Sequence, residues 1–179
     1  RAGLLLRDNW LHRGQIEKAY CKAIGLARHE IVIANAYFVP GRKVRRALIH
    51  AAGRGVRVRL LLQGRYEYFM QFHAVRPVYS SLLAVGVEIH EYTASFLHAK
   101  VAVIDAHHDR PWATVGSSNL DPLSLLMARE ANVVVADGPF AQQLRDRLVR
   151  AIAEESIPIE SAVFADRPRL QRALDWVAY

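Results

Sequence analysis

The chain has 179 residues, of which 52% are apolar, and its 24 basic and 17 acidic residues give it a formal net charge of +7. This length and apolar content are enough for one domain with a hydrophobic core, and they exclude an intrinsically disordered chain. The positive charge favours anionic partners, either phospholipid headgroups or nucleic acid. No apolar run reaches the roughly 18 residues needed to span a bilayer. The single cysteine, Cys21, excludes an internal disulfide, which suits a cytosolic or inner-leaflet location.

The first half of the chain alternates between helical and strand patterns. Apolar residues recur at helical spacing after Gly14, and short β-rich runs follow the helices. Gly53 ends a basic helix, and Pro77 interrupts a later one. The predicted elements are a helix over 14–28, a strand over 31–37, a helix over 42–52, a strand over 56–62 and a helix over 69–85.

The second half begins with strands and a hairpin. The predicted elements are a strand over 87–92, a motif-bearing strand up to 105, a polar turn over 107–111, a returning strand over 112–115, a helix beginning at Asp121-Pro122, a strand over 131–135 and a helix over 139–154. This order predicts an α/β fold in which a mixed β-sheet is flanked by α-helices. We expect one domain over residues 1–155. The remaining 156–179 form a tail, irregular from Ile157, with a short helix near 168–176.

One segment carries most of the chemical information. Residues 96–105 read FLHAKVAVID, which contains the pattern HxKxxxxD, and GSSN follows at 116–119. Alternate residues of a strand share a face, so we expect His98 and Lys100 to point the same way. An imidazole can attack phosphorus or protonate a leaving alkoxide, and an ammonium group can neutralise phosphate oxygens. The pair therefore predicts a phosphoryl-transfer site.

The residues after this pair complete the predicted site. Ser117 and Asn119, in a loop that leads into a helix N-terminus, are expected to bind phosphate. Glu130 begins the next strand and is expected to fix the tautomer of the imidazole. Asp105 lies an odd number of positions from His98, so a structural role is expected for it rather than chemistry.

A less specific interpretation exists for each piece alone. A lone HxK on a strand is usually surface sequence, and GSSN alone is usually a turn. Here the two occur in order along a strand, hairpin, helix and strand, with a carboxylate at the end. This joint occurrence favours a functional site.

The motif resembles the one that defines the phospholipase D superfamily, HxKxxxxD followed by GSxN and a later Glu. The match covers His98, Lys100, Asp105, Gly116, Ser117, Asn119 and Glu130. Ten residues separate Asp105 from Gly116, where the superfamily typically has six, and the extra residues fall in the polar turn. The stretches 34–40 and 115–132 (VGSSNLDPLSLLMAREAN) further resemble the carboxy-terminal half of bacterial cardiolipin synthases in this superfamily.

This resemblance implies a phospholipase D-like fold and a transphosphatidylation through a phosphohistidine, without metal or cofactor. One histidine attacks the phosphodiester, and the other protonates the leaving alcohol and then activates the incoming one. The superfamily site uses two such motifs, and this chain has one. His98 is expected to be the acid/base partner rather than the nucleophile. Gly116 and Asp105 are expected to be structural parts of the motif.

The implied partners are phosphatidylglycerol as substrate and an amino-terminal half, or a second copy, that supplies the other motif. The implied location is the cytoplasmic side of the bacterial inner membrane, by peripheral contact, and a nucleic-acid partner is not expected. Two alternatives stay open. The chain can be a homodimeric phosphodiesterase or endonuclease of the same superfamily, or a half-domain that is inactive alone.

Three further features have a functional and a structural interpretation. The aromatic segment 65–73 can form a rim that meets lipid headgroups, or its rings can fill the core. Trp10 and His12 can line the cleft, although a surface position is expected. His107 and His108 lie in a polar turn with no third metal ligand at usable spacing, so we expect them to be solvated.

Overall fold

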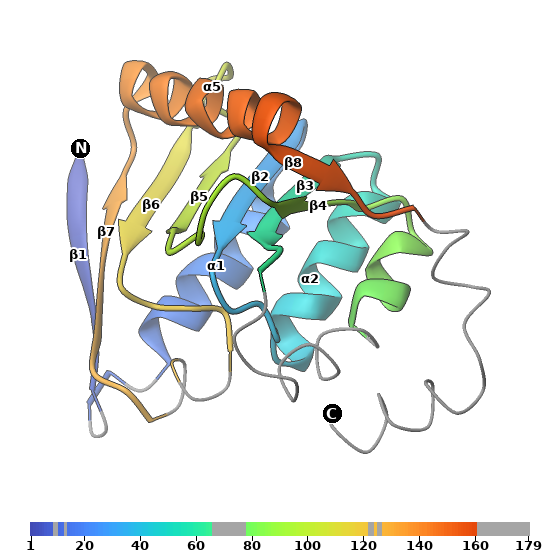
Figure 1. Cartoon of the computed structure of the whole chain (residues 1–179). Coiled ribbons are helices and arrows are strands. Elements are labelled where there is room, and N and C mark those ends of the chain that lie inside the picture. The colour runs from blue at the N-terminus through green and yellow to red at the C-terminus, as the bar shows by residue number, and fades with distance from the viewer. Residues whose placement is uncertain (9–10, 13, 66–77, 122–123, 125–126, 161–179) are drawn as a thin grey trace.

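The computed structural model describes residues 1–8, 11–12, 14–65, 78–121, 124 and 127–160. Its centre is an eight-stranded mixed sheet with the strand order β1-β7-β6-β5-β2-β3-β4-β8 (Figure 1). The strands are β1 (Ala2–Arg7), β2 (Glu30–Asn35), β3 (Arg57–Gln63), β4 (Glu88–Tyr92), β5 (Lys100–Ile104), β6 (Trp112–Gly116), β7 (Glu130–Val135) and β8 (Ser156–Pro158).

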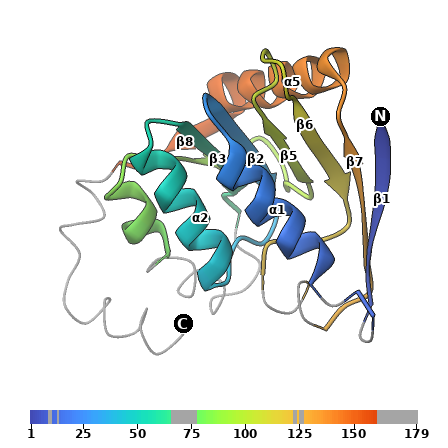
Figure 2. The same ribbon diagram turned by 180° about the vertical axis from the view of Figure 1, so that it is seen from behind.

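Helices cover both faces of this sheet. α1 (Gln15–Leu26) and α2 (Arg42–Gly53) lie side by side on one face, and Figure 2 shows them in front of the strands. Their apolar sides pack on β2 and β3 in the larger core, which includes Ile24, Leu48 and Ile33. α5 (Gly138–Glu155) crosses the other face and closes a smaller core with residues such as Val32 and Leu148. Strands buried between two helical layers need apolar side chains on both faces, as β2 has.

The directions of the strands bring four strand ends to one edge of the sheet. β2, β3 and β4 are parallel, whereas β5 runs antiparallel to β2 and continues through β6 and β7 as antiparallel neighbours. Consequently the carboxyl ends of β2 and β6 lie beside the amino ends of β5 and β7. The two halves of the motif, HxK at the start of β5 and GSSN at the end of β6, meet at this edge.

The expected mixed sheet flanked by helices is confirmed. Apart from the helix predicted to begin at Asp121-Pro122, the predicted strands and helices between residues 14 and 62 and between 87 and 154 appear with shifts of a few residues at their ends. One boundary differs more, because β5 begins only at Lys100 and His98 precedes it.

Two edge strands were not predicted. β1 reads AGLLLR and lacks the alternation of polar and apolar residues that marks a strand. β8 has three residues and contains a proline, which is tolerated at an edge. The expectation of an irregular tail was wrong for residues 157–158, which pair with β4. The expected helix over 168–176, the helix start at Pro122, Trp10 and most of the aromatic segment 65–73 lie outside the described residues.

Candidate active site

His98 and Lys100 are in direct contact at the edge where the strand ends meet. Nζ of Lys100 lies 2.6 Å from Nδ1 of His98 and donates a second hydrogen bond to the carbonyl oxygen of His98 at 3.1 Å. The imidazole is exposed to solvent, while Lys100 is 7% exposed. An ammonium group that donates to Nδ1 leaves the proton of a neutral imidazole on Nε2, the ring nitrogen that faces away from the lysine.

The environment of Lys100 is polar but contains no carboxylate in contact with it among the described residues. Across the sheet its neighbour on β2 is Asn35, which is fully buried. Burial lowers the pKa of the Lys100 ammonium, and the negative charges of Glu130 and Asp121 oppose this only in part. A buried cation without a contacting anion is suited to receive a phosphate.

Ser117 and Glu130 form the second pair of the site. The hydroxyl of Ser117 donates to Oε2 of Glu130 and accepts from the backbone N–H of Ala131 at 3.1 Å. At Gly116 a Cβ would collide with the carbonyl of Ala131 and the side chain of Asn132, so only glycine fits between β6 and β7. The carboxylate of Glu130 therefore meets the serine hydroxyl, and its expected role behind the imidazole stays a prediction.

Asn119 and Asn35 fasten the GSSN loop to the end of β2. Oδ1 of Asn119 accepts from the backbone N–H of Tyr37 at 3.3 Å, and Oδ1 of Asn35 accepts from the N–H of Leu120 at 3.2 Å. Both asparagines are buried. Because 85 residues separate Asn35 from Leu120, the loop is held by tertiary structure and not by local turn chemistry.

Asp105 lies at the far end of β5, away from these groups. Its carboxylate accepts hydrogen bonds of 2.9 Å from the backbone N–H groups of Arg28, His29 and Glu30, where the chain enters β2. Its backbone has a φ of 49°, a left-handed conformation that aspartate tolerates better than most residues. In the structure Asp105 therefore holds a loop and contacts no phosphate-binding group.

Sequence reasoning missed two residues of this region, Asn35 and Arg7. Arg7 ends β1 and is 2% exposed; it lines a pocket of about 600 Å³ together with Ser117, Arg129 and Glu130. Asn35 is preceded by an apolar run that identifies a strand, and its polar side chain at the strand's end was the available signal. Arg7 had no such signal, because β1 itself was not recognised.

The remaining histidines that the sequence singled out lie outside the contact network. His12 binds Asp8 with Nδ1 to Oδ2 at 2.8 Å. His107 and His108 are exposed, and the ring of His108 stacks on His29 with centroids 3.5 Å apart. Within the described ranges no cluster of three histidine, cysteine or acidic side chains is arranged to hold a metal ion. In the same ranges no helix is long and apolar enough to cross a membrane.

Comparisons with known proteins identify the family of this chain. The family described as cardiolipin synthase, phospholipase D-like domain, matches residues 20–152. Cardiolipin synthase B of Escherichia coli strain K12 is 45% identical over 164 residues, which cover 92% of this chain and 39% of that protein. The chain thus spans well under half the length of this relative.

Two solved structures share the fold. Nuc from Salmonella typhimurium, titled as a phospholipase D family member, superposes with a TM-score of 0.73 at 16% identity, covering 89% of this chain and 98% of that one. Phosphatidylserine synthase of Haemophilus influenzae superposes with a TM-score of 0.74 at 10% identity, covering 98% of this chain and 44% of that one. At these identities the superpositions show the fold, whereas the family follows from the sequence match. The chain belongs to the cardiolipin synthase family of phospholipase D-like domains.

Proposed function

We propose that this chain is the carboxy-terminal half of a phospholipid transphosphatidylase of the cardiolipin synthase type. The observation that carries the proposal is the contact between His98 and Lys100 at 2.6 Å, beside the GSSN loop. It places a titratable imidazole next to a buried cation with no contacting carboxylate in the described part of the chain. The 45% identity to cardiolipin synthase B supports the choice of lipid chemistry.

The reaction proceeds in two displacements. The histidine of a second motif attacks the phosphorus of one phosphatidylglycerol and forms a phosphohistidine, while His98 in its imidazolium form gives the proton on Nε2 to the departing glycerol oxygen and becomes neutral. The glycerol hydroxyl of a second phosphatidylglycerol then gives its proton to His98 and attacks the phosphohistidine. The products are cardiolipin and glycerol, and both histidines return to their starting protonation states.

The other motif residues support these steps. Lys100 neutralises the phosphate oxygens on which negative charge grows in each transition state. Ser117 and Asn119 bind the same phosphate from the GSSN loop. Glu130 stabilises the positive charge that the site acquires when an imidazole is protonated, acting through Ser117.

The second motif comes from another half of the protein or from a second copy of this chain. This part of the proposal rests on the single HxK in the sequence and on the 39% of the length of cardiolipin synthase B that the chain matches. A single copy of the chain is then inactive as a monomer. Because the substrate is a membrane lipid, we place the enzyme at the cytoplasmic face of the bacterial inner membrane, held by peripheral contact, with residues 1–155 as the catalytic domain.

The test is to incubate the full-length gene product with phosphatidylglycerol vesicles and to follow cardiolipin and glycerol by mass spectrometry. Equal amounts of both products are expected, unchanged by a chelator. The His98→Gln variant should make neither. Absence of cardiolipin from the unmodified, folded protein would refute the proposal.

One observation favours a second candidate, a homodimeric phosphodiesterase. This chain covers 98% of the Nuc chain, so a chain of about this size is titled a phospholipase D family member. The net charge of +7 suits a nucleic-acid substrate. Chelator-resistant cleavage of DNA by a dimer, abolished in His98→Gln, would support this candidate over the lipid one.

A further inference from the structure

Arg7 is a buried cation that lacks a carboxylate partner in the described part of the chain. It lies at the end of β1 directly opposite Glu130 of β7, and its side chain is 2% exposed. Its Nη1 donates to the carbonyl oxygen of Ala128. Nε and Nη2 are buried and have no hydrogen-bond partner among the described residues, and no ion pair joins Arg7 to Glu130.

A buried, unpaired guanidinium group lowers the stability of the fold unless an anion binds to it. Removing a guanidinium group from water is unfavourable, and proteins usually compensate with a carboxylate or a bound anion. Arg59 is buried to a similar degree and donates to Glu30 at 2.5 Å. Arg7 has no equivalent within the described residues, so its position is better explained by a ligand than by the stability of the fold.

The pocket beside Arg7 has room for that ligand. Its volume is about 600 Å³, and its charged lining groups are Arg7, Asp8, Arg129 and Glu130. Both carboxylates are engaged, since Asp8 binds His12 and Glu130 accepts from Ser117. The two arginines are the cations that can meet an anion there. Ser117 and Glu130 also belong to the candidate active site, so the pocket adjoins the reacting groups.

We propose that Arg7 and Arg129 bind the phosphate of the acceptor lipid. This inference rests on the proposed function. Both substrates of a cardiolipin synthase carry a phosphodiester, but only the donor's phosphorus reacts at His98 and Lys100. The acceptor presents a hydroxyl to the reaction centre, and its own anionic phosphate must lie at a distance from it. A second pair of cations next to Ser117 supplies that position and selects alcohols that carry a negative charge.

The experiment compares two acceptors in one reaction. The full-length gene product is given phosphatidylglycerol vesicles together with ethanol, a neutral acceptor, and both cardiolipin and phosphatidylethanol are quantified. In the Arg7→Gln variant we expect the ratio of cardiolipin to phosphatidylethanol to fall at least about tenfold, as for the loss of a charged hydrogen bond. A change in yield with an unchanged ratio would overturn the inference, because Arg7 would then serve the donor or the fold.

Three further variants sharpen the test. Arg129→Gln, which changes an exposed side chain, should lower the ratio in the same direction but less. Arg7→Lys should recover part of it, and Arg46→Gln, an exposed arginine on α2, should leave it unchanged. If Arg7→Gln does not fold, an unchanged ratio in Arg129→Gln overturns the inference. If the unmodified protein forms neither product, the proposed function itself has failed.

Discussion

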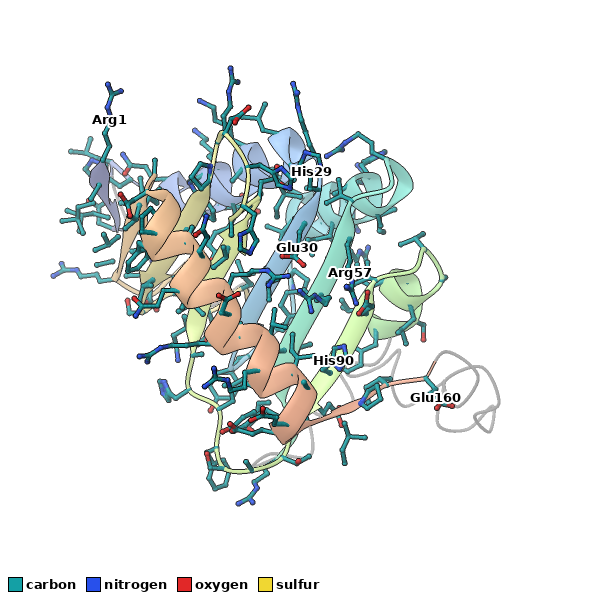
Figure 3. All side chains as sticks on the ribbon, turned by 90° about the horizontal axis from the view of Figure 1, so that it is seen from above. Arg1, His29, Glu30, Arg57, His90 and Glu160 are labelled. Atoms are coloured by element: carbon teal, nitrogen blue, oxygen red, sulfur yellow. The ribbon has the colours of Figure 1, made fainter. Side chains whose placement is uncertain are left out.

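Cations from neighbouring elements lie beside both ends of β2, but only at one end are they paired with a carboxylate among the described residues. At the beginning of the strand, Glu30 accepts from Nη2 of Arg59 at 2.5 Å and from Nε of Arg145 at 2.7 Å, below α5. Figure 3 looks onto this face and places Glu30 on β2 beside β3, which carries Arg57. At the other end of the strand, Lys100 contacts the neutral acceptors of His98. The cations at the first end are paired with a carboxylate, whereas Lys100 at the second end has no contacting carboxylate among the described residues.

The pKa values express this difference. Burial by itself would raise the pKa of Glu30, but the hydrogen bonds and charges of Arg145 and Arg59 together hold it below its ordinary value. Glu30 therefore stabilises the fold most at a pH above the ordinary value of 4.5, and this stabilisation is lost as the pH falls through its lowered pKa. Burial lowers the pKa of Lys100, so folding there disfavours the charge that a phosphate would restore. We therefore expect the end of β2 near Glu30 to serve stability and the end near Lys100 to serve binding.

The largest effect on activity is expected from a change at His98. The His98→Gln variant should lose activity by about a thousandfold or more, because an amide can neither donate nor accept the proton at phosphorus. The imidazole is exposed, so the free energy of unfolding should stay within about 0.5 kcal/mol of the original. Rates of cardiolipin formation and thermal unfolding measure the two effects. A residual rate of a tenth would exclude His98 from the chemistry.

Glu30→Gln should give the reverse result. Removing the carboxylate leaves Arg59 buried without an anion, and the free energy of unfolding should fall by about 3 kcal/mol. Activity per folded molecule should not change, since Glu30 lies at the opposite end of β2 from the site. Urea denaturation at pH 7 measures the loss. At a pH below the lowered pKa of Glu30 the difference between the two proteins should shrink, and an undiminished difference would contradict the ionic explanation.

Lys100→Met should lower activity without lowering the stability of the fold. We expect a loss of about a hundredfold in kcat/KM, because one charge-stabilising group is removed. The free energy of unfolding should be unchanged or higher, since a buried cation without a carboxylate is replaced by an apolar chain of similar length. A large loss of stability would show that the ammonium group is structural.

The pH dependence of the unmodified enzyme gives a smaller and related effect. Because the pKa of Lys100 lies below 10.5, activity should decline on the alkaline side at a lower pH than an ordinary lysine would allow. Lys100→Arg, even with a reduced rate, should lose that decline because a guanidinium keeps its proton. An identical alkaline limb in Lys100→Arg would assign the titration to another group.

Asp105→Asn is expected to have the smallest effect. The amide keeps one oxygen for the N–H groups of residues 28–30 and tolerates the left-handed backbone, but it loses the charge on these hydrogen bonds. A loss of about 1.5 kcal/mol in the free energy of unfolding is expected, with unchanged activity per folded molecule. Denaturation and rate measurements on the same sample check both. A hundredfold loss of activity would give Asp105 a role in the chemistry.

Local sequence patterns predicted much of this molecule. The apolar spacing of 14–28 and 42–52 identified α1 and α2, since helix and strand periodicities depend on neighbouring residues only. The motif identified His98 and Lys100 for a similar reason, because two positions in sequence already bring their side chains together. A structural position was expected for Asp105 from strand parity. Its carboxylate lies at the far end of β5, but β5 begins at Lys100 and His98 precedes it, so parity along one strand is not the reason.

Tertiary structure decided the rest. Arg7 comes to lie opposite Glu130 only because β1 is the outer neighbour of β7, and Asn35 reaches Leu120 only because β5 returns beside β2. No local period encodes such pairings, which depend on the order of strands in the sheet. The sequence by itself therefore identified the groups that are candidates for phosphoryl transfer, whereas the fold determined which cations have no anion beside them among the described residues. The reason is that the reactivity of a group depends on the side chain itself, whereas the pairing of its charge depends on the residues that the fold places beside it.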